Sequence, residues 1–282
     1  MIPVWRLLIT GARDAAWNMA CDEALSESVH DGISAPVVRF FQWEPPALSF
    51  GYSQKVDREV NLARVHADGI GIVRRVSGGR AVFHADEVTY SVICRQDDPV
   101  ASGGITATYF RISEGLADGV RRCGLNATLA HQADPGVSPR STAATLPCFG
   151  STARAEIVIG GRKLVGSAQH RTRDLMLQHG SILTGPRHKD IVNWLHAEEA
   201  VRDRFRRVLD SSTTSMSEAG WRGNDAAAIE YMAEGMRATL NLEWDREPLS
   251  PTEQQRIDEL VETKYATDGW TFSPRGHASR EQ

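Results

Sequence analysis

The pattern of apolar and polar residues predicts a chain of short strands in the first two thirds and helices at the end. Apolar runs between glycines and prolines predict strands at 4–9, 37–41, 47–50, 72–73, 81–83, 88–94, 155–159, 163–167 and 175–183. Helical spacing predicts helices at 14–29, 56–67, 106–123, 191–197, 225–240 and 252–263. Asp14 is the expected N-cap of the first helix, and Gly160-Gly161 a tight hairpin turn. This order predicts an α+β fold with a mixed or mostly antiparallel sheet, flanking helices and a helical C-terminal tail.

A change of composition suggests how the chain is divided. The segment 208–224 is rich in Ser, Thr and Gly, and only helical patterns follow it. We therefore expect a catalytic core over 1–207. A linker and a helical extension packed on that core would make up 208–282.

The composition narrows the class of protein. The chain has 282 residues, 41% of them hydrophobic, and a net charge of -4, so it is long enough for a large core and has no basic excess for nucleic acid. No apolar run reaches the length of a membrane span, and the N-terminus does not resemble a signal peptide, so we expect a cytoplasmic protein with no membrane partner. The four cysteines are far apart in sequence, which favours free thiols over a zinc knuckle or disulfides.

The most informative local feature is a Ser-Gly-Gly turn between two apolar runs, flanked by Arg74, Arg75 and Arg80. Glycine lets bare backbone approach a ligand, and successive N–H groups suit a carbonyl, a carboxylate or a phosphate. Taken alone, the segment could equally be a surface hairpin. If it holds a substrate carbonyl, Gly79→Val should stop the reaction without unfolding the protein.

Several motifs together resemble one known group of enzymes. They are Arg-Arg-Val-Ser-Gly-Gly at 74–79, Cys148-Phe149, Gly-Arg-Lys-Leu-Val-Gly-Ser-Ala-Gln at 161–169, Gln-His-Gly-Ser at 178–181 and Lys-Tyr-x-x-x-x-Trp at 264–270. In this order they resemble the lipoate/octanoate transferase and ligase superfamily, which is similar in fold to biotin protein ligase. Within it the chain resembles the LipM-type octanoyltransferases. The resemblance implies transfer of an octanoyl group from octanoyl-acyl carrier protein to a lysine of a lipoyl domain, such as that of the glycine-cleavage H protein or a 2-oxoacid dehydrogenase E2.

The resemblance also implies roles for individual residues. Cys148 would carry the acyl thioester and Lys163 would assist it, because a nearby cation stabilises a thiolate. The acyl chain and its carbonyl would be bound by Arg75, Ser77, Gly78, Gly79, Arg80, Ala81, Val82, Phe83, His84, Gly166, Ser167, Ala168, His179, Gly180 and Ser181. This chemistry needs no metal and no other cofactor.

Three alternatives stay open at this point. An ATP-dependent lipoate–protein ligase shares the Arg-Arg-x-Ser-Gly-Gly segment, but it needs no cysteine, and it resembles a pattern with glycine where this chain has Arg80. An amidotransferase that takes octanoate from one lipoyl domain to another would use the same cysteine. In a non-catalytic acyl-binding protein, Cys148 would be a buried packing residue, the commoner fate of a free cysteine.

Overall fold

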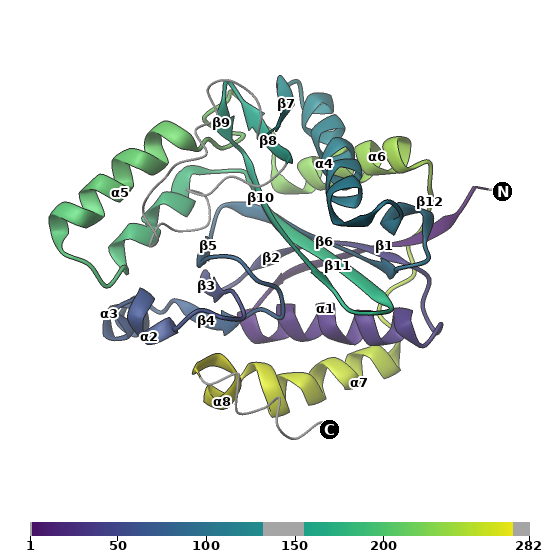
Figure 1. Ribbon diagram of the computed structural model, residues 1–282, viewed down its shortest axis with the longest axis horizontal. Coiled ribbons are helices and arrows are strands. Elements are labelled where there is room, and N and C mark those ends of the chain that lie inside the picture. The colour runs from purple at the N-terminus through teal and green to yellow at the C-terminus, as the bar shows by residue number, and fades with distance from the viewer. Residues whose placement is uncertain (1, 132–154, 273–282) are drawn as a thin grey trace.

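A six-stranded sheet forms the centre of the protein (Figure 1). The computed structural model describes residues 2–131 and 155–272. The strand order is β10 (Val165–Arg171), β11 (Leu175–Leu183), β6 (Glu87–Arg95), β2 (Val37–Trp43), β1 (Val4–Arg13) and β12 (Glu243–Asp245). β1 pairs in parallel with β2 and β12, and the other pairs are antiparallel. The predicted α+β fold with a mixed sheet is confirmed.

Two three-stranded sheets flank the central one. The first has the order β4 (Gly71–Arg74), β3 (Ala47–Phe50), β5 (Val82–His84). The second has the order β7 (Ala127–His131), β8 (Ala155–Ile159), β9 (Arg162–Lys163). The predicted hairpin turn joins β8 to β9, and its glycines have φ of 56° and 75°, values that glycine adopts without strain.

The Ser-Gly-Gly segment is not a hairpin turn between neighbouring strands. β4 and β5 lie on opposite sides of β3, one parallel to it and the other antiparallel. Residues 75–81 therefore cross the end of β3, where the Arg75 N–H donates to Phe50 O at 2.8 Å and the Tyr52 N–H donates to Ser77 O at 2.9 Å. The crossing is close: a Cβ on Gly51 would lie 2.2 Å from Gly79 O.

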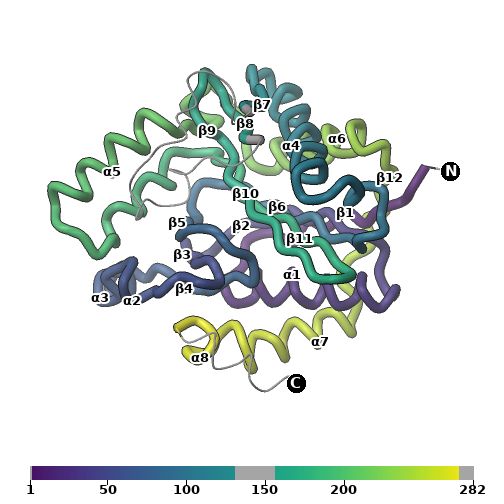
Figure 2. The backbone as a smooth tube through the Cα atoms, in the orientation of Figure 1, coloured from purple at the N-terminus to yellow at the C-terminus, as the bar shows by residue number. Residues whose placement is uncertain are grey.

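Helices cover both faces of the central sheet. α1 (Ala15–His30) connects β1 to β2, and the predicted cap is present, since Asp14 accepts a hydrogen bond from the Trp17 N–H at 2.9 Å. α7 (Pro251–Leu260) and α8 (Asp268–Phe272) follow on the same face, and Figure 2 shows this C-terminal segment running beside α1. α4 (Gly104–Arg122) and α6 (Asp225–Leu240) cover the other face and pack closely, because a Cβ on Gly235 would lie 2.3 Å from the Gly119 nitrogen.

Buried polar contacts hold the C-terminal segment against the core. Arg6 of β1 pairs with Glu253 of α7 at 2.7 Å. The Trp270 indole donates to Arg74 O at 3.0 Å, which joins α8 to the strand that precedes the Ser-Gly-Gly segment. α7 and α8 are therefore packed against the core. The division at 207/208 stays a prediction, and α5 (Glu199–Ser212) runs through it.

Two predicted helices differ from the observed ones. The segment 56–67 forms two short helices, α2 (Val56–Glu59) and α3 (Leu62–Ala67), because Val60 is extended and bridges Leu195. A 3₁₀ helix at Pro186–Asn193 replaces the helix expected at 191–197. In both places a contact distant in sequence overrides local spacing.

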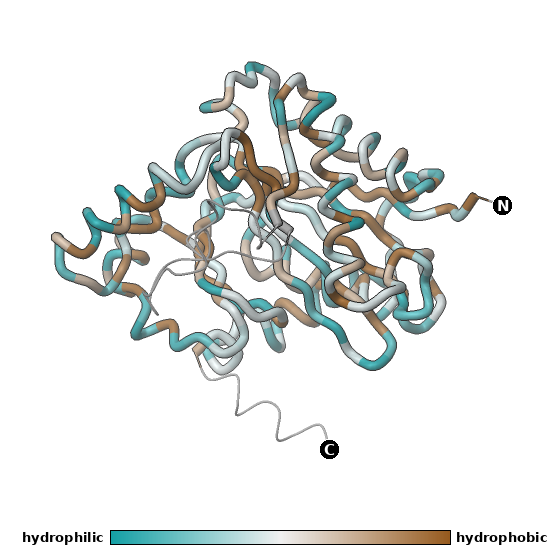
Figure 3. The backbone as a smooth tube through the Cα atoms, turned by 45° about the horizontal axis from the view of Figure 1, so that its top comes forward, coloured by the Kyte–Doolittle hydropathy of each residue, from teal (hydrophilic) through white to brown (hydrophobic). Residues whose placement is uncertain are grey.

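Apolar residues gather on the central strands and the helix sides that face them, whereas hydrophilic residues dominate the peripheral loops (Figure 3). One apolar cluster lies between the sheet and α4 and α6, and the other between the sheet, α1 and the C-terminal helices. Among the described residues, no helix is long and apolar enough to cross a membrane.

Candidate active site

A pocket opens on the α1 side of the central sheet, beneath the Ser-Gly-Gly segment. Its floor comes from β10 and β11, its sides from β5, β6 and the end of β2, and one wall from α1. It encloses about 370 Å³ of empty space including its mouth. The lining residues are Met19, Trp43, Arg75, Val82, His84, Thr89, Gly166, Ser167, Ala168, His179, Gly180 and Ser181.

The structure brings together most of the residues expected to bind the acyl group. Those on the wall are Arg75, Val82, His84, Gly166, Ser167, Ala168, His179, Gly180 and Ser181. Ser77, Gly78, Gly79, Arg80 and Ala81 belong to the segment above the pocket, and none of them is a wall residue. Phe83 alternates with its strand neighbours and packs on Trp194, with ring centroids 4.6 Å apart.

A chain of hydrogen bonds runs through His84. Its Nδ1 lies 2.7 Å from Glu87 Oε1 and its Nε2 lies 2.5 Å from Ser49 Oγ. A carboxylate only accepts, so the Nδ1–H of His84 donates to Glu87. Trp43 stacks on the imidazole, with centroids 4.0 Å apart and planes 13° apart. The ring is thus fixed at both nitrogens and on one face.

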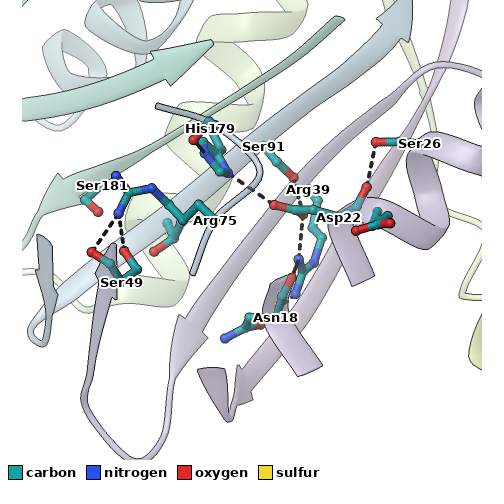
Figure 4. Close-up of polar contacts among 12 residues, drawn as sticks. Asn18, Asp22, Ser26, Arg39, Ser49, Arg75, Ser91, His179 and Ser181 are labelled. Carbon is teal, nitrogen blue, oxygen red and sulfur yellow. Dashed lines mark hydrogen bonds and ion pairs between the residues drawn. The ribbon is translucent and has the colours of Figure 1, made fainter. Parts of the chain in front are cut away.

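His179 makes a similar chain of polar contacts, of which Figure 4 shows the one to Asp22. Its Nε2 lies 2.6 Å from Ser77 Oγ, and its Nδ1 lies 3.5 Å from Asp22 Oδ2. Burial lowers the pKa of His179, and the nearby Asp22 offsets only part of this effect, so the imidazole is neutral near pH 7. Burial acts to raise the pKa of Asp22, but Arg39 at 2.7 Å and His179 outweigh it and hold that pKa below its usual range.

Arg75 shapes the segment above the pocket. Its guanidinium donates to Ser49 Oγ at 2.6 Å and to the carbonyl of Arg80 at 2.9 Å. These bonds tie the two ends of the Ser-Gly-Gly segment to β3. The loop is therefore held by a buried, planar donor that makes several hydrogen bonds at once, a role that suits arginine.

The expectation for Gly79→Val needs a correction. Gly79 has a φ of 100°, a conformation that a branched residue adopts only with strain, so this substitution would disturb the loop itself. Gly78 has no positive φ, and a Cβ there would meet nothing within 4 Å. A substitution at Gly78 is therefore the better test of whether the substrate occupies the space above the pocket.

Lys163 lies next to the pocket and is paired with an acid. It ends β9, three residues before the pocket residue Gly166. Its Nζ is 2.6 Å from Glu156 Oε1 of β8, and both side chains are buried. No motif marks Glu156, because the β8–β9 hairpin alone brings the two together. Cys148 lies outside the described residues, so the expected contact between Cys148 and Lys163 stays a prediction.

The three cysteines of the described residues are buried. Burial raises the pKa of Cys21 to about 12 and that of Cys123 to about 11, and it raises the pKa of Cys94 as well. Thiols of this kind are poor nucleophiles at neutral pH. They fit the expected packing role.

Sequence reasoning missed three wall residues, Met19, Trp43 and Thr89. They lie on α1, β2 and β6, elements predicted correctly but without any motif that marks them. Their approach to the pocket depends on the order of the strands. Within the described ranges, no group of three or more His, Cys, Asp or Glu residues could hold a metal ion.

Comparison with known proteins defines the class first. The family model for the lipoyl protein ligase A/B catalytic domain matches residues 14–236. Among solved structures, the bipartite lipoate protein ligase of Thermoplasma acidophilum superposes with a TM-score of 0.80 at 22% identity and covers 96% of both chains. At that identity the likeness speaks for the fold alone.

Two curated relatives narrow the family. An octanoyltransferase LipM from Moorella thermoacetica is 40% identical over 94% of this chain and 97% of its own length. One from Kyrpidia tusciae is 38% identical over 95% of this chain and 98% of its own length. The chain belongs to the lipoyl protein ligase A/B family and, within it, to the LipM octanoyltransferases.

Proposed function

We propose that this protein moves an octanoyl group from a carrier-protein thioester to its own Cys148 and then to a lysine of a lipoyl domain. The observation that carries this is the pocket lined by β10, β11, β5 and Arg75, whose residue Gly166 follows the buried Lys163 by three positions. Its apolar wall residues, among them Met19, Trp43 and Val82, suit an alkyl chain. The partners are octanoyl-acyl carrier protein as donor and the lipoyl domain of a glycine-cleavage H protein or an E2 subunit as acceptor.

The first half-reaction forms an acyl-enzyme. The Cys148 thiol gives up its proton and its thiolate attacks the thioester carbonyl. The bond between the carbonyl carbon and the carrier's sulfur breaks, and the departing sulfur takes up the released proton. Lys163 stabilises the attacking thiolate. Backbone N–H groups of the Ser-Gly-Gly segment stabilise the developing oxyanion, an effect worth about 3–4 kcal/mol per donor.

The second half-reaction releases the product. The neutral lysine amine of the acceptor attacks the Cys148 thioester, an amide bond forms, and the cysteine thiol takes back the proton that the amine loses. Atoms and charge balance without an oxidant, a nucleotide or a metal. The chemistry therefore needs a pocket that holds the chain and a cysteine beside its mouth.

The test is an incubation with octanoyl-acyl carrier protein, with and without ATP and a lipoyl domain, followed by intact-mass measurement of both proteins. We expect an octanoyl increment on the enzyme that hydroxylamine removes, and transfer to the acceptor without ATP. Cys148→Ser should show neither, whereas Cys123→Ser, a matched change of a buried thiol, should show both.

Three outcomes would contradict the proposal. Transfer that requires ATP and persists in Cys148→Ser would indicate a ligase. Acceptance of octanoate only from an octanoylated H protein, and not from the carrier protein, would indicate an amidotransferase. An enzyme that retains octanoate but never passes it on would be a binding protein.

A further inference from the structure

A second cavity lies on the same face of the sheet as the acyl pocket, end to end with it. Its lining includes Glu23, Val76, His170 and Leu177, with about 670 Å³ of empty space including its mouth. Each of these residues is a close neighbour of a pocket residue on the same element. On β10 and β11 the pocket residues Ala168 and His179 pair, and two residues further along His170 pairs with Leu177, on the same side of the strands.

A polar partition made of Ser77, His179 and Asp22 lies between the two cavities. On α1, Asp22 falls between the pocket residue Met19 and the second-cavity residue Glu23. Figure 4 shows its carboxylate reaching toward His179, with Ser26 beyond it. Ser77 then joins His179 from the loop side at 2.6 Å, so the partition crosses from helix to sheet to loop.

The partition is rigid because neighbouring buried residues hold its members in place. Asp22 pairs with the buried Arg39 at 2.7 Å and accepts from Ser91 Oγ at 2.9 Å. His179 is held between Ser77 and Asp22 and has no freedom to rotate without losing one of them. A chain that pushed through would have to separate buried polar groups from one another.

Contact between the partition and an alkyl chain is also unfavourable, because the partition contains a charged carboxylate. Asp22 is buried, but Arg39 and His179 hold its pKa below the usual range, so its carboxyl group is charged. Its Oδ2 lies 3.5 Å from His179 Nδ1 and has no closer hydrogen-bond partner within the described chain. Methylene groups placed against this oxygen would desolvate it further and could not donate a hydrogen bond to it, which is unfavourable.

We propose that the Ser77–His179–Asp22 partition ends the acyl pocket and thereby limits the chain length, and that the second cavity receives the distal end of a longer acyl chain once the partition is opened. The identity of the ligand as an acyl chain rests on the proposed function. Val76, Leu175 and Leu177 give the second cavity an apolar side for such a chain, and its other side is polar, with Lys264 and Glu23 paired at 2.8 Å.

The informative variants are at His179 and Leu177. His179→Ala removes the centre of the partition, and His179→Gln is the matched control that keeps a hydrogen-bonding side chain of similar reach. Leu177→Phe narrows the second cavity and lies outside the acyl pocket. Asp22 is unsuitable, because its removal would leave Arg39 buried without its carboxylate. Should His179→Ala not fold, His179→Ser opens the same space and keeps a hydroxyl beside Asp22.

The measurement is the ratio of dodecanoyl to octanoyl loading from the two acyl carrier proteins, by intact mass. We expect His179→Ala to raise this ratio at least about tenfold over wild type, the scale of discrimination that a few methylenes provide. His179→Gln should leave this loading ratio close to that of wild type. The double variant His179→Ala/Leu177→Phe should lower the ratio again, most of the way to the wild-type value. An unchanged ratio in folded His179→Ala, or no reversal by Leu177→Phe, would overturn the proposal.

Binding of free octanoic and dodecanoic acids, followed by calorimetry, separates this inference from the proposed function. If wild type transfers nothing but binds octanoate better than dodecanoate, and His179→Ala reverses that order, the partition stands and the transferase proposal fails. If octanoyl transfer is normal and His179→Ala binds both acids as wild type does, the transferase stands and the partition is wrong.

Discussion

Replacing Lys163 by methionine should destabilise the protein by removing one partner of a buried ion pair. At 2.6 Å between Nζ and Oε1, and with an effective dielectric constant of about 20, the attraction is about 6 kcal/mol before desolvation is subtracted. Removing one partner of a buried ion pair costs about 3–5 kcal/mol. For a chain of this length we expect Tm to fall by about 6–10 °C, at roughly 2 °C per kcal/mol.

The assay separates this stability effect from catalysis. Thermal unfolding and octanoyl transfer are measured for wild type, Lys163→Met, Glu156→Gln and the double variant. The double variant removes both charges, so it should recover most of the lost stability while it still transfers slowly, because the cation beside the proposed Cys148 thiolate is gone.

Two results would refute this reasoning. If the stability losses of Lys163→Met and Glu156→Gln simply add in the double variant, the ion pair contributes no coupling energy. If the double variant transfers octanoate at the wild-type rate, Lys163 has no part in the reaction, and its position beside the pocket serves the β8–β9 hairpin alone.

Three further predictions concern other parts of the structure. Iodoacetamide should alkylate Cys148 alone at pH 7, because burial raises the pKa of Cys21, Cys94 and Cys123. Lys163→Met should slow that alkylation, because it removes the cation expected to stabilise the Cys148 thiolate. Burial lowers the pKa of His188 from 6.5 to about 4, so the native state binds fewer protons than the unfolded state between these values. About 3 kcal/mol of stability, present above pH 6.5, should therefore be lost as the pH falls to 4, less so in His188→Gln. Gly78→Val should slow octanoyl transfer with little change in Tm, whereas Gly79→Ala should cost about 1–2 kcal/mol of stability.

Each of these has a clear contrary result. Alkylation of a second cysteine in the folded protein at pH 7 would contradict the burial argument. An equal loss of stability with falling pH in wild type and His188→Gln would assign the acid sensitivity to other groups. Normal transfer by Gly78→Val would remove the loop from the acyl site.

The sequence by itself determined the features that depend on neighbouring residues. Asp14 caps α1 because its side chain meets an N–H three residues later, and Gly160-Gly161 turns because only glycine takes both φ values cheaply. The order of the motifs around 75–84, 166–168 and 178–181 likewise predicted much of the pocket wall. These features depend on residues close together in the sequence, so residue type and spacing are enough to predict them.

Only the tertiary structure decided which distant residues meet. β3 lies between β4 and β5, so the Ser-Gly-Gly segment crosses a strand end instead of closing a hairpin. Strand order and helix packing also bring Met19, Trp43 and Thr89 to the pocket from elements that carry no motif. Glu156 reaches Lys163 across a hairpin, at a separation where no periodicity links them. The spacing of residues along a strand or helix determines on which face of that element a side chain lies. The order of the strands and the packing of the elements determine which other residues that face contacts.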